Sequence, residues 1–497
     1  MEMERKETSK KHDVQEREFD IASYIESRNT KPGHEGNEFE ERGDSKEFYT
    51  VCAHMRTIID AMDGKELEEN TALDRQYKAL IGQELEVAYY RNKIKQILEE
   101  KQLSATVYPS WFQSLEDAVF QEAYGFSSIS NWIQSVGTLK FSPSCKIIGE
   151  RIYYDINGVL ELQKQTISKE RRAKLRDMLL LPDPTKDRAK AYQEVYLADG
   201  SRVTIYSDYG MTKKGQDSIV FRKYLANTST FEDQVKRHTI PKEAIILFQL
   251  MVQCGFNVAF TGPVKSAKTT MMSIWQSHED PKLEGLCIEN DPEIPLHLMM
   301  PTAPIMQLVP AEEYMDEVIA TAKRSDAQYI IIGEARQGRM MNLSLEAANM
   351  GTRHCKTNMH TSETVDFAYD VADKVTKECG GDLACCMIKV AKSFQYIVNM
   401  MSLPSDYGQK RLKGLWEMRY DSESMKITMH QICKYRVEHD DWVWSYDIGE
   451  KVKEIGIEEN AKAFKELEEC LKKLAKEFPN TGKTVFEPPY LKALLGR

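Results

Sequence analysis

The sequence predicts an α/β protein: a mainly parallel sheet with a phosphate-binding loop, preceded by a small α+β domain and an N-terminal helical region. Two observations lead to this prediction. From about residue 243 onward, helical and strand patterns alternate along the chain, which is typical of a parallel sheet covered by helices on both faces. Within the first of these repeats, the segment FNVAFTGPVKSAKTT (residues 256–270) places an apolar strand, a turn and a Lys-Thr pair in the order of a phosphate-binding loop.

Composition limits the class of protein. The chain has 497 residues and a formal net charge of −10, which argues against a broad nucleic-acid-binding face. No run of residues approaches the roughly 18 apolar residues of a membrane span, and the first residues lack a signal-peptide pattern. The ten cysteines lack the paired spacing of a zinc site. We therefore expect reduced thiols and a cytoplasmic protein, or one peripheral to a membrane.

Two segments open the chain. Residues 1–48 are rich in acidic side chains and poor in large apolar ones, so they predict a disordered acidic arm. Residues 49–140 instead place apolar side chains at helical spacing, which predicts a helical region.

A change of period follows. Residues 145–237 contain alternating apolar and polar runs, with Asn157-Gly158 and Asp199-Gly200 as hairpin turns, and DSIVFRKY as a further strand. This pattern predicts a separate α+β N-terminal domain. The polar stretch at residues 238–242 is the expected linker to the next domain.

Residues 243–450 form the predicted domain with the parallel sheet and the phosphate-binding loop, and residues 451–497 form a C-terminal helix and tail. The runs GLWEMRY and MKITMHQICKY, beyond residue 400, predict antiparallel additions to the sheet. In the tail, Ile457, Ala461, Phe464, Leu467, Leu471 and Leu474 fall on one face of an amphipathic helix, which we expect to dock on its own protein. The elements expected before them are helices at 243–254, 268–277, 312–323 and 337–350, and strands at 256–261, 284–289, 328–332 and 356–360.

The phosphate-binding loop has one departure from the usual G-x-x-x-x-G-K-[ST] pattern. In such loops backbone N–H groups surround the phosphates, a lysine reaches the terminal phosphate, and a hydroxyl binds Mg²⁺. Gly262 and Lys268-Thr269 are correctly spaced, but Ala267 replaces the second glycine, and a Cβ there restricts the backbone. The candidate loop residues are Gly262, Pro263, Val264, Lys265, Ser266, Ala267, Lys268, Thr269 and Thr270.

Polar side chains follow the next strands of the predicted sheet. A lone acidic loop, arginine or histidine is structural more often than functional. Here four such groups follow one phosphate-binding loop, at the ends of successive strands that meet at one edge of the sheet. Carboxylates at that edge can hold Mg²⁺ or activate water. The groups are the acidic box with Glu289, Asp291 and Glu293, then Glu334, Arg336 and His360.

At this point the sequence resembles the ATPases of type II secretion, type IV secretion and pilus assembly, most of all the branch that drives tight-adherence (Flp-type) pili. That family has a DG hairpin, an R-K strand, an acidic box, a G-E-x-R box and a histidine box in this order. The resemblance covers residues from about 145 to 435. The corresponding segments are LADGSRV (197–203), IVFRK (219–223), IENDPE (288–293), GEAR (333–336) and MHTS (359–362).

The resemblance implies a hexameric ring motor with a RecA-like ATPase domain, ATP and Mg²⁺ as cofactors, and an integral-membrane platform protein as partner. It places the protein in the cytoplasm, peripheral to the inner face of the bacterial cell membrane, with no nucleic-acid partner. By the same resemblance, Lys268 and Thr269 bind phosphates and Mg²⁺, and Glu334 manages the metal and the water. The remaining roles are water activation by Glu293 with Glu289, phosphate contacts by Arg202 and Arg222, nucleotide or subunit contact by Arg336, and coupling by His360.

Departures from the family pattern leave a second interpretation open. Val264, Lys265 and Ala267 differ from the family loop, and Asn290 replaces an aspartate of the acidic box. Val264, Ala267 and Asn290 favour a structural ring subunit that binds nucleotide weakly or not at all, whereas retention of Lys268, Thr269, Glu334 and His360 favours the motor. Lys265 is a candidate for an additional phosphate contact. A DNA-handling ATPase is disfavoured by the acidic charge balance.

Overall fold

The computed structural model describes residues 44–66, 69–181, 191–197, 199–207, 210–224, 228–322, 324–349, 351–361 and 363–488. The predicted arm at residues 1–48 lies outside these ranges apart from its end, which belongs to the first described helix. By internal contacts the chain divides into two compact units. The first comprises Met1–Lys140, Cys145–Tyr153 and Leu162–Phe221, and the second Phe141–Ser144, Tyr154–Glu161 and Arg222–Arg497.

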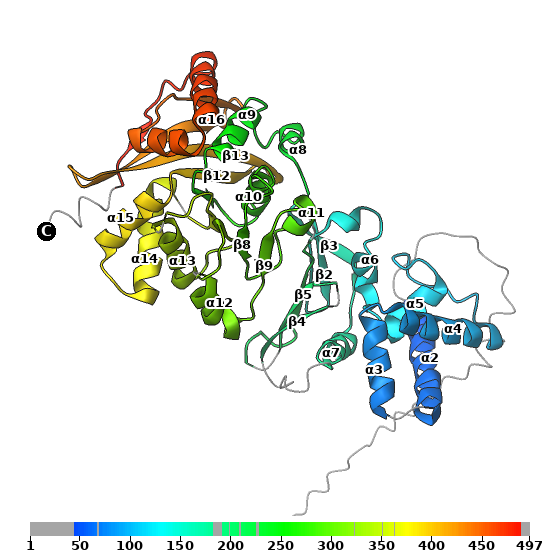
Figure 1. Cartoon of the computed structure of the whole chain (residues 1–497). Helices are drawn as coiled ribbons and strands as arrows, with labels where there is room; N and C mark the ends of the chain where they lie inside the picture. Colours follow the sequence, from blue (N-terminus) through cyan, green and yellow to red (C-terminus); the bar gives the residue numbers. More distant parts are fainter. Residues whose placement is uncertain are drawn as a thin grey trace, which may run out of the picture. The chain divides into compact units, whose positions relative to one another are not determined.

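The helical part of the first unit has its own core (Figure 1). Buried aromatic and aliphatic side chains from successive helices meet there, among them Phe48, Met55, Ile94 and Phe120. Helical structure is therefore present where the spacing of apolar residues predicts it. The helices are α2 (Asp44–Glu66), α3 (Glu69–Leu80), α4 (Glu84–Glu100) and α5 (Leu115–Ala123), followed by the short α6 (Ser130–Ile133).

A six-stranded sheet follows, with strand order β3-β2-β1-β6-β5-β4. Both predicted hairpins are present. At the first, Asn157 and Gly158 have φ of 51° and 89°, and two successive positive φ values match the tight turn that an Asn-Gly pair favours. Helix α7 (Lys169–Leu179) was not anticipated from the sequence. The strands are β1 (Ser144–Ile148), β2 (Arg151–Ile156), β3 (Val159–Thr166), β4 (Tyr192–Tyr196), β5 (Arg202–Tyr206) and β6 (Ser218–Arg222).

The second unit contains a ten-stranded sheet of order β15-β14-β13-β12-β7-β11-β10-β8-β9, with β16 paired to β14. The strands from β12 to β9 in this order are parallel, and those from β12 to β15 are antiparallel. The predicted mainly parallel α/β sheet is therefore confirmed. The strands are β7 (Val258–Thr261), β8 (Gly285–Ile288), β9 (Ile305–Leu308), β10 (Tyr329–Ile332), β11 (Lys356–Met359), β12 (Tyr396–Leu403), β13 (Asp406–Asp421), β14 (Lys426–Arg436), β15 (Asp441–Trp444) and β16 (Val485–Phe486).

Helices cover both faces of this sheet (Figure 1). In β7, Val258 and Phe260 lie in one hydrophobic core, and Ala259 between them lies in the other. This alternation explains why β7, β8 and β10 are largely apolar along their length. The first core includes side chains of α9 (Ala244–Gln253), α10 (Lys268–Gln276) and α16 (Glu450–Glu477), and the second those of α12 (Met315–Ala322), α13 (Gly338–Asn349), α14 (Phe367–Cys379) and α15 (Leu383–Ser393).

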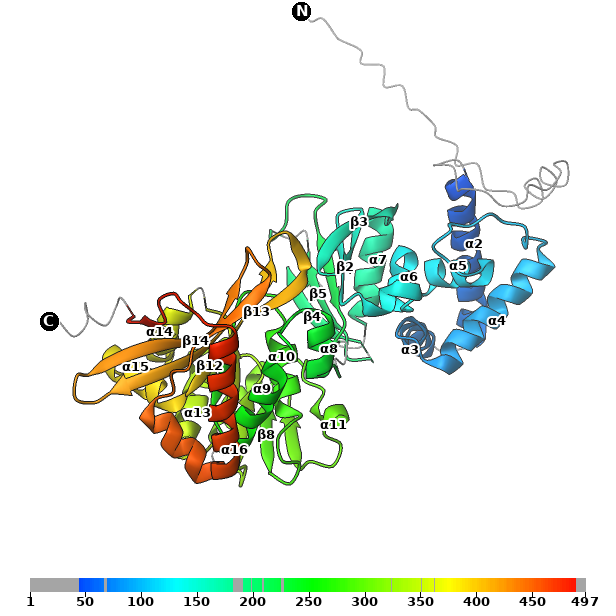
Figure 2. The same cartoon turned by 90° about the horizontal axis from the view of Figure 1, so that it is seen from above.

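The C-terminal helix α16 lies beside α9, in agreement with the prediction that it docks on its own protein (Figure 2). The predicted buried face is wrong at two positions, because Ile457 and Ala461 are exposed. Asn460 has non-helical φ and ψ of −155° and 89°, and this kink shifts the buried face between the two halves of the helix. Within the described part of the chain, every helix falls short of the length and apolar character needed to cross a bilayer.

Candidate active site

A cavity of about 450 Å³ lies in the second unit at the phosphate-binding loop. Strands β7, β10 and β11 all end beside it, so the parallel sheet collects residues from distant parts of the sequence. Most of the candidate residues named from the sequence are brought together here. The lining residues are Arg222, Val264, Lys265, Ser266, Ala267, Lys268, Thr269, Thr270, Glu293, Glu334, Arg336, Asn358 and His360.

The backbone of the loop has the conformation that glycine favours. Gly262 has a φ of 137°, and a Cβ built there would lie 2.1 Å from the carbonyl oxygen of Met400, so only glycine fits. Ala267 has φ of 69° and ψ of 25°, in the left-handed region. An L-residue in this region costs roughly 1–2 kcal/mol relative to a right-handed conformation. The alanine therefore changes the energy of the loop and leaves its left-handed turn in place.

Lys268 opens helix α10 and is 5% exposed. Its Nζ donates to the carbonyl oxygen of Pro263 at 2.7 Å and lies 3.2 Å from Nδ1 of His360. None of the described carboxylates forms an ion pair with this ammonium group. Burial accordingly lowers the pKa of Lys268 to about 8. A buried cation at a helix N-terminus that makes no ion pair is suited to an anionic ligand.

Thr269 follows and faces two side chains. Its Oγ1 accepts a hydrogen bond from Nδ2 of Asn358 at 2.8 Å and lies 3.4 Å from Oε2 of Glu293. Asn358 was missed in the sequence. It lies on β11 two residues before His360, and residues two apart in a strand share a face, so this spacing could have identified it.

Glu334 is held by a histidine and an arginine. Its Oε1 lies 3.0 Å from Nε2 of His360, and its Oε2 accepts from Nη2 of Arg336 at 2.7 Å. Burial alone would raise the pKa of Glu334, but these two hydrogen bonds outweigh burial and hold the pKa at about 2. Nδ1 of His360 lies 3.1 Å from the carbonyl oxygen of Gly262, so His360 bridges the loop and Glu334.

Glu293 forms an ion pair with Arg222, and its pKa is shifted in the opposite direction to that of Glu334. Burial raises the pKa of Glu293, and the nearby Arg222 guanidinium reverses only part of that shift. The site therefore contains one carboxylate that is firmly ionised and one that takes up a proton more easily.

Four candidate residues lie elsewhere than expected. Glu289 is 2% exposed and does not line the cavity; its Oε1 accepts from the backbone N–H groups of Glu293 and Ile294 at 3.0 and 2.9 Å, so it positions Glu293. Gly262 and Pro263 shape the loop without lining the cavity. Arg202 belongs to the first unit, where its Nε lies 3.2 Å from Glu194, and its predicted phosphate contact stays a prediction.

The idea that Lys265 adds a phosphate contact is not supported by its geometry. The Lys265 ammonium group forms an ion pair with the buried carboxylate of Asp155. A lysine committed to an anion in this way is not free to neutralise a phosphate in this conformation. Lys265 therefore serves to hold the loop, whose φ at this residue is 61°.

The residues present fit a nucleotide with Mg²⁺. Lys268 offers an unpaired positive charge, and the hydroxyl of Thr269 with the carboxylate of Glu334 offers the oxygen ligands that Mg²⁺ prefers. In the described part of the chain, no group of three or more His, Cys, Asp or Glu side chains is arranged to hold a metal by itself.

No family model matches the chain. Among curated proteins, it is similar to the uncharacterized protein MJ0781 of Methanocaldococcus jannaschii, at 25% identity over 287 residues, or 53% of this chain. The matched part spans 39% of that relative's length.

Among solved structures, the chain is similar to the ATPase DotB of Yersinia pseudotuberculosis (14% identity, TM-score 0.43, 74% of this chain and 89% of that one). It is also similar to DotB of Legionella pneumophila (15%, 0.41, 70% and 88%) and to the VirB11 ATPase of the Brucella suis type IV secretion system (15%, 0.31, 58% and 95%). Each of these three proteins is named an ATPase. The tight-adherence branch stays a prediction.

Proposed function

We propose that this protein hydrolyses ATP as a hexameric motor of a type II or type IV secretion or tight-adherence pilus assembly system. It works at the cytoplasmic face of the cell membrane and acts on an integral-membrane platform protein. The observation that carries the proposal is the cavity at the phosphate-binding loop. The buried Lys268, which makes no ion pair, lines this cavity together with Glu334, Glu293 and His360. The motif order along the chain supports the choice of secretion and pilus systems, and the acidic charge balance supports a motor without a nucleic-acid partner.

The chemistry follows from the side chains around the cavity. Lys268 and the N–H groups at the start of α10 bind the terminal phosphates. Glu293 accepts the proton of the attacking water, which forms a bond to the γ-phosphorus while the bond to the ADP oxygen breaks. Mg²⁺, held through Thr269 and Glu334, would supply charge neutralisation on the phosphate oxygens.

Arg222 and His360 link this chemistry to movement. Arg222 is paired with Glu293 in the structure, so a γ-phosphate competes with that carboxylate for the guanidinium group. His360 touches the loop on one side and Glu334 on the other, so it registers whether the terminal phosphate is present. Hydrolysis removes the γ-phosphate, so the contacts of Arg222 and His360 change. In this way the nucleotide state alters the conformation of the protein.

Steady-state ATP hydrolysis by the assembled full-length protein tests the proposal. We expect Mg²⁺-dependent release of phosphate, and we expect Lys268→Ala to abolish both this activity and the binding of a fluorescent ATP analogue, because it removes the one cation buried in the loop. Lys282→Ala, at an exposed lysine outside the cavity, is the control and should behave as the parent protein. A parent protein that neither binds nor hydrolyses ATP would contradict the proposal.

Nucleotide affinity should fall as the pH rises above 8. The pKa of Lys268 is about 8 without ligand, and a phosphate beside it raises that pKa, so binding above pH 8 requires uptake of a proton. We expect the dissociation constant for ADP to rise about tenfold for each pH unit above 8. Calorimetry at pH 7, 8 and 9 measures this. The Lys268→Arg protein keeps its positive charge over this pH range, so its dissociation constant for ADP should not change with pH. If the dissociation constants of both proteins rise equally with pH, a group other than Lys268 causes the pH dependence.

The left-handed Ala267 favours one other candidate function, a structural ring subunit that binds nucleotide weakly. Ala267→Gly separates the two. For a motor whose loop already has the required turn, we expect ATP turnover to change by less than about threefold, with a stability change of about 1 kcal/mol or less. For a structural subunit limited by this alanine, restoring glycine raises nucleotide affinity or turnover more than about tenfold. Paired measurements of turnover and thermal unfolding give the answer.

A further inference from the structure

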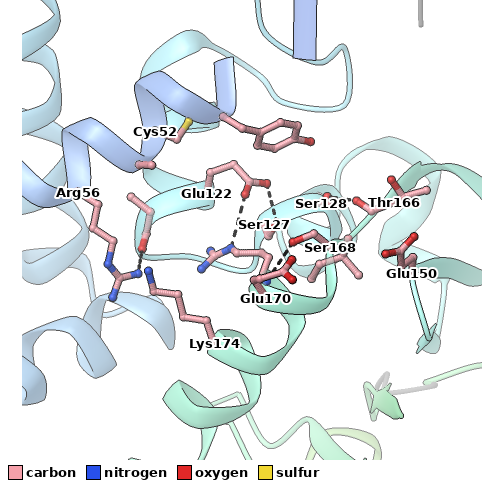
Figure 3. Close-up of a pocket in the computed structure, with 15 residues that line it drawn as sticks. Cys52, Arg56, Glu122, Ser127, Ser128, Glu150, Thr166, Ser168, Glu170 and Lys174 are labelled. Atoms are coloured by element: carbon pink, nitrogen blue, oxygen red, sulfur yellow. Dashed lines mark hydrogen bonds and ion pairs between the residues drawn. The ribbon is translucent and has the colours of Figure 1, made fainter. Parts of the chain in front are cut away.

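A second cavity, of about 540 Å³, lies within the first unit and shares no residue with the phosphate-binding loop. Its walls come from helix α2, from the end of α5 with the turn after it, and from α7 with the end of β3. Figure 3 shows Cys52, Arg56, Glu122 and Lys174 around this space, with the end of the Lys174 side chain close to Arg56. The volume is in the range of small-molecule sites.

Three cationic side chains line this cavity: Arg56, Arg171 and Lys174. Arg171 is 11% exposed, and its Nη2 donates to the carbonyl oxygens of Gln121 and Gly125 at 2.9 and 3.0 Å. Its Nη1 is buried and has no hydrogen-bond partner among the described residues. A buried guanidinium donor without an acceptor is costly, so negative charge placed close to Arg171 would stabilise the protein.

The side chain of Lys174 also lines the cavity and extends toward Arg56 (Figure 3). In the described part of the chain it takes part in no hydrogen bond or ion pair. Burial, and then repulsion from Arg56 and Arg171, lower its pKa to about 8. Gathering three positive groups in one place destabilises the protein unless a negative charge joins them.

The carboxylates of the cavity do not supply enough of that charge. Glu122 is the buried one; its Oε2 lies 3.5 Å from Nε of Arg171, and its Oε1 accepts from the hydroxyl of Ser127 at 2.6 Å. Burial raises the pKa of Glu122, which weakens it as a counter-ion. Glu150 and Glu170 are exposed, where water screens them. Asp60, outside the lining, is paired with Arg56 at 3.3 Å.

We propose that this cavity binds a small organic phosphate. The phosphate accepts from the ammonium group of Lys174, and the guanidinium groups of Arg171 and Arg56 add positive charge nearby. A phosphate dianion matches several converging cations better than a carboxylate, which carries one charge. The rest of the ligand lies against the apolar side of the lining, formed by Tyr49, Ala53 and Ile167. This is a second ligand site, and it does not depend on the proposed ATPase activity.

Calorimetry with phenyl phosphate tests the site, because this probe joins a phosphate to an apolar ring. The experiment uses the full-length protein with the substitution Lys268→Ala, which removes the phosphate-binding loop as a competing site for the phosphate. We expect saturable binding that Lys174→Met weakens at least about tenfold by removing a charge-assisted hydrogen bond. Lys169→Met is the matched control on the same helix, since Lys169 is exposed and does not line the cavity, and it should leave binding unchanged. Without ligand, Lys174→Met should unfold at the same temperature as the parent or a higher one.

Each of the following results would overturn the proposal. Phenyl phosphate binds equally to the Lys174→Met and Lys169→Met proteins, or does not bind at millimolar concentration. Phenylacetate binds more tightly than phenyl phosphate, which would assign the site to carboxylates. Vesicles containing phosphatidate bind the protein while phenyl phosphate does not, which would assign the phosphate to a lipid headgroup. Lys174→Gln repeats the test with a polar side chain, and a lower unfolding temperature in both Lys174 variants would make the lysine a structural residue.

Discussion

Replacing Glu293 by glutamine should lower the rate of ATP hydrolysis about 10²- to 10⁴-fold, the range expected for loss of a general base. ATP affinity should be unchanged or higher, because the substitution keeps the shape of the side chain and removes the carboxylate that competes with the γ-phosphate for Arg222. The reason lies in the two carboxylates of the cavity. Burial raises the pKa of Glu293, whereas hydrogen bonds from His360 and Arg336 hold that of Glu334 at about 2.

Opposite shifts of this kind assign different roles to two carboxylates in one site. A group with a pKa of about 2 stays ionised and accepts protons poorly, so Glu334 is suited to orienting a cation or water. Glu293 binds a proton more easily and is suited to accepting one from the attacking water. We therefore expect Glu334→Gln to raise the Mg²⁺ concentration needed for half-maximal activity, an effect that Glu293→Gln should lack.

The pH profile of kcat/KM provides the sharper measurement. If Glu293 is the base, activity falls as the pH drops through its raised pKa, and the acid limb lies above the ordinary pKa of a glutamate. The residual activity of Glu293→Gln should then show no such limb. Glu317→Gln, at an exposed position on α12, is the control and should reproduce the parent profile. An unchanged acid limb in Glu293→Gln would assign the base to another residue.

Local patterns were sufficient for the central part of this fold. The apolar runs that became β7, β8 and β10 are buried on both faces, so they are continuous in the sequence and easily recognised. The Asn-Gly and Asp-Gly turns fixed two hairpins in advance. Strand β12 was missed, although it pairs with β7 in the middle of the sheet, because no motif marks it and its partner is far away in the sequence.

The side chains of the site were harder to predict than the strands. The position of Glu289 in the acidic box does not show whether its side chain points to the cavity or inward. In the structure it points inward, where it accepts hydrogen bonds from the backbone N–H groups of the following turn. Lys265 found an anion in Asp155, more than a hundred residues earlier. Such pairings depend on tertiary contacts, and local spacing carries no information about them.

Replacing Glu279 by leucine should lower the free energy of unfolding by about 3–5 kcal/mol, the cost of leaving a buried partner charge uncompensated. Glu279 follows α10, and its carboxylate accepts from the ammonium group of Lys356 and lies 2.7 Å from Nδ1 of His354. The side chains of Glu279 and Lys356 are 3% and 0% exposed. After the substitution, Lys356 keeps only the carbonyl oxygen of His354, at 2.9 Å, and the ring of Tyr329, at 5.4 Å.

Denaturant and thermal unfolding of four proteins measure this effect. In the double variant Glu279→Leu with Lys356→Met both charges are gone, so we expect most of the lost stability to return. Asp373→Ala is the control, because its pair with Lys377 is exposed and should contribute less than about 1 kcal/mol.

The pKa of Glu279 is lowered in the folded protein: burial opposes this, but Lys356 and His354 outweigh it. Its contribution is therefore complete above the ordinary pKa of glutamate and is lost as the pH falls below it. A single variant as stable as the double variant would show that the buried ammonium group finds another partner.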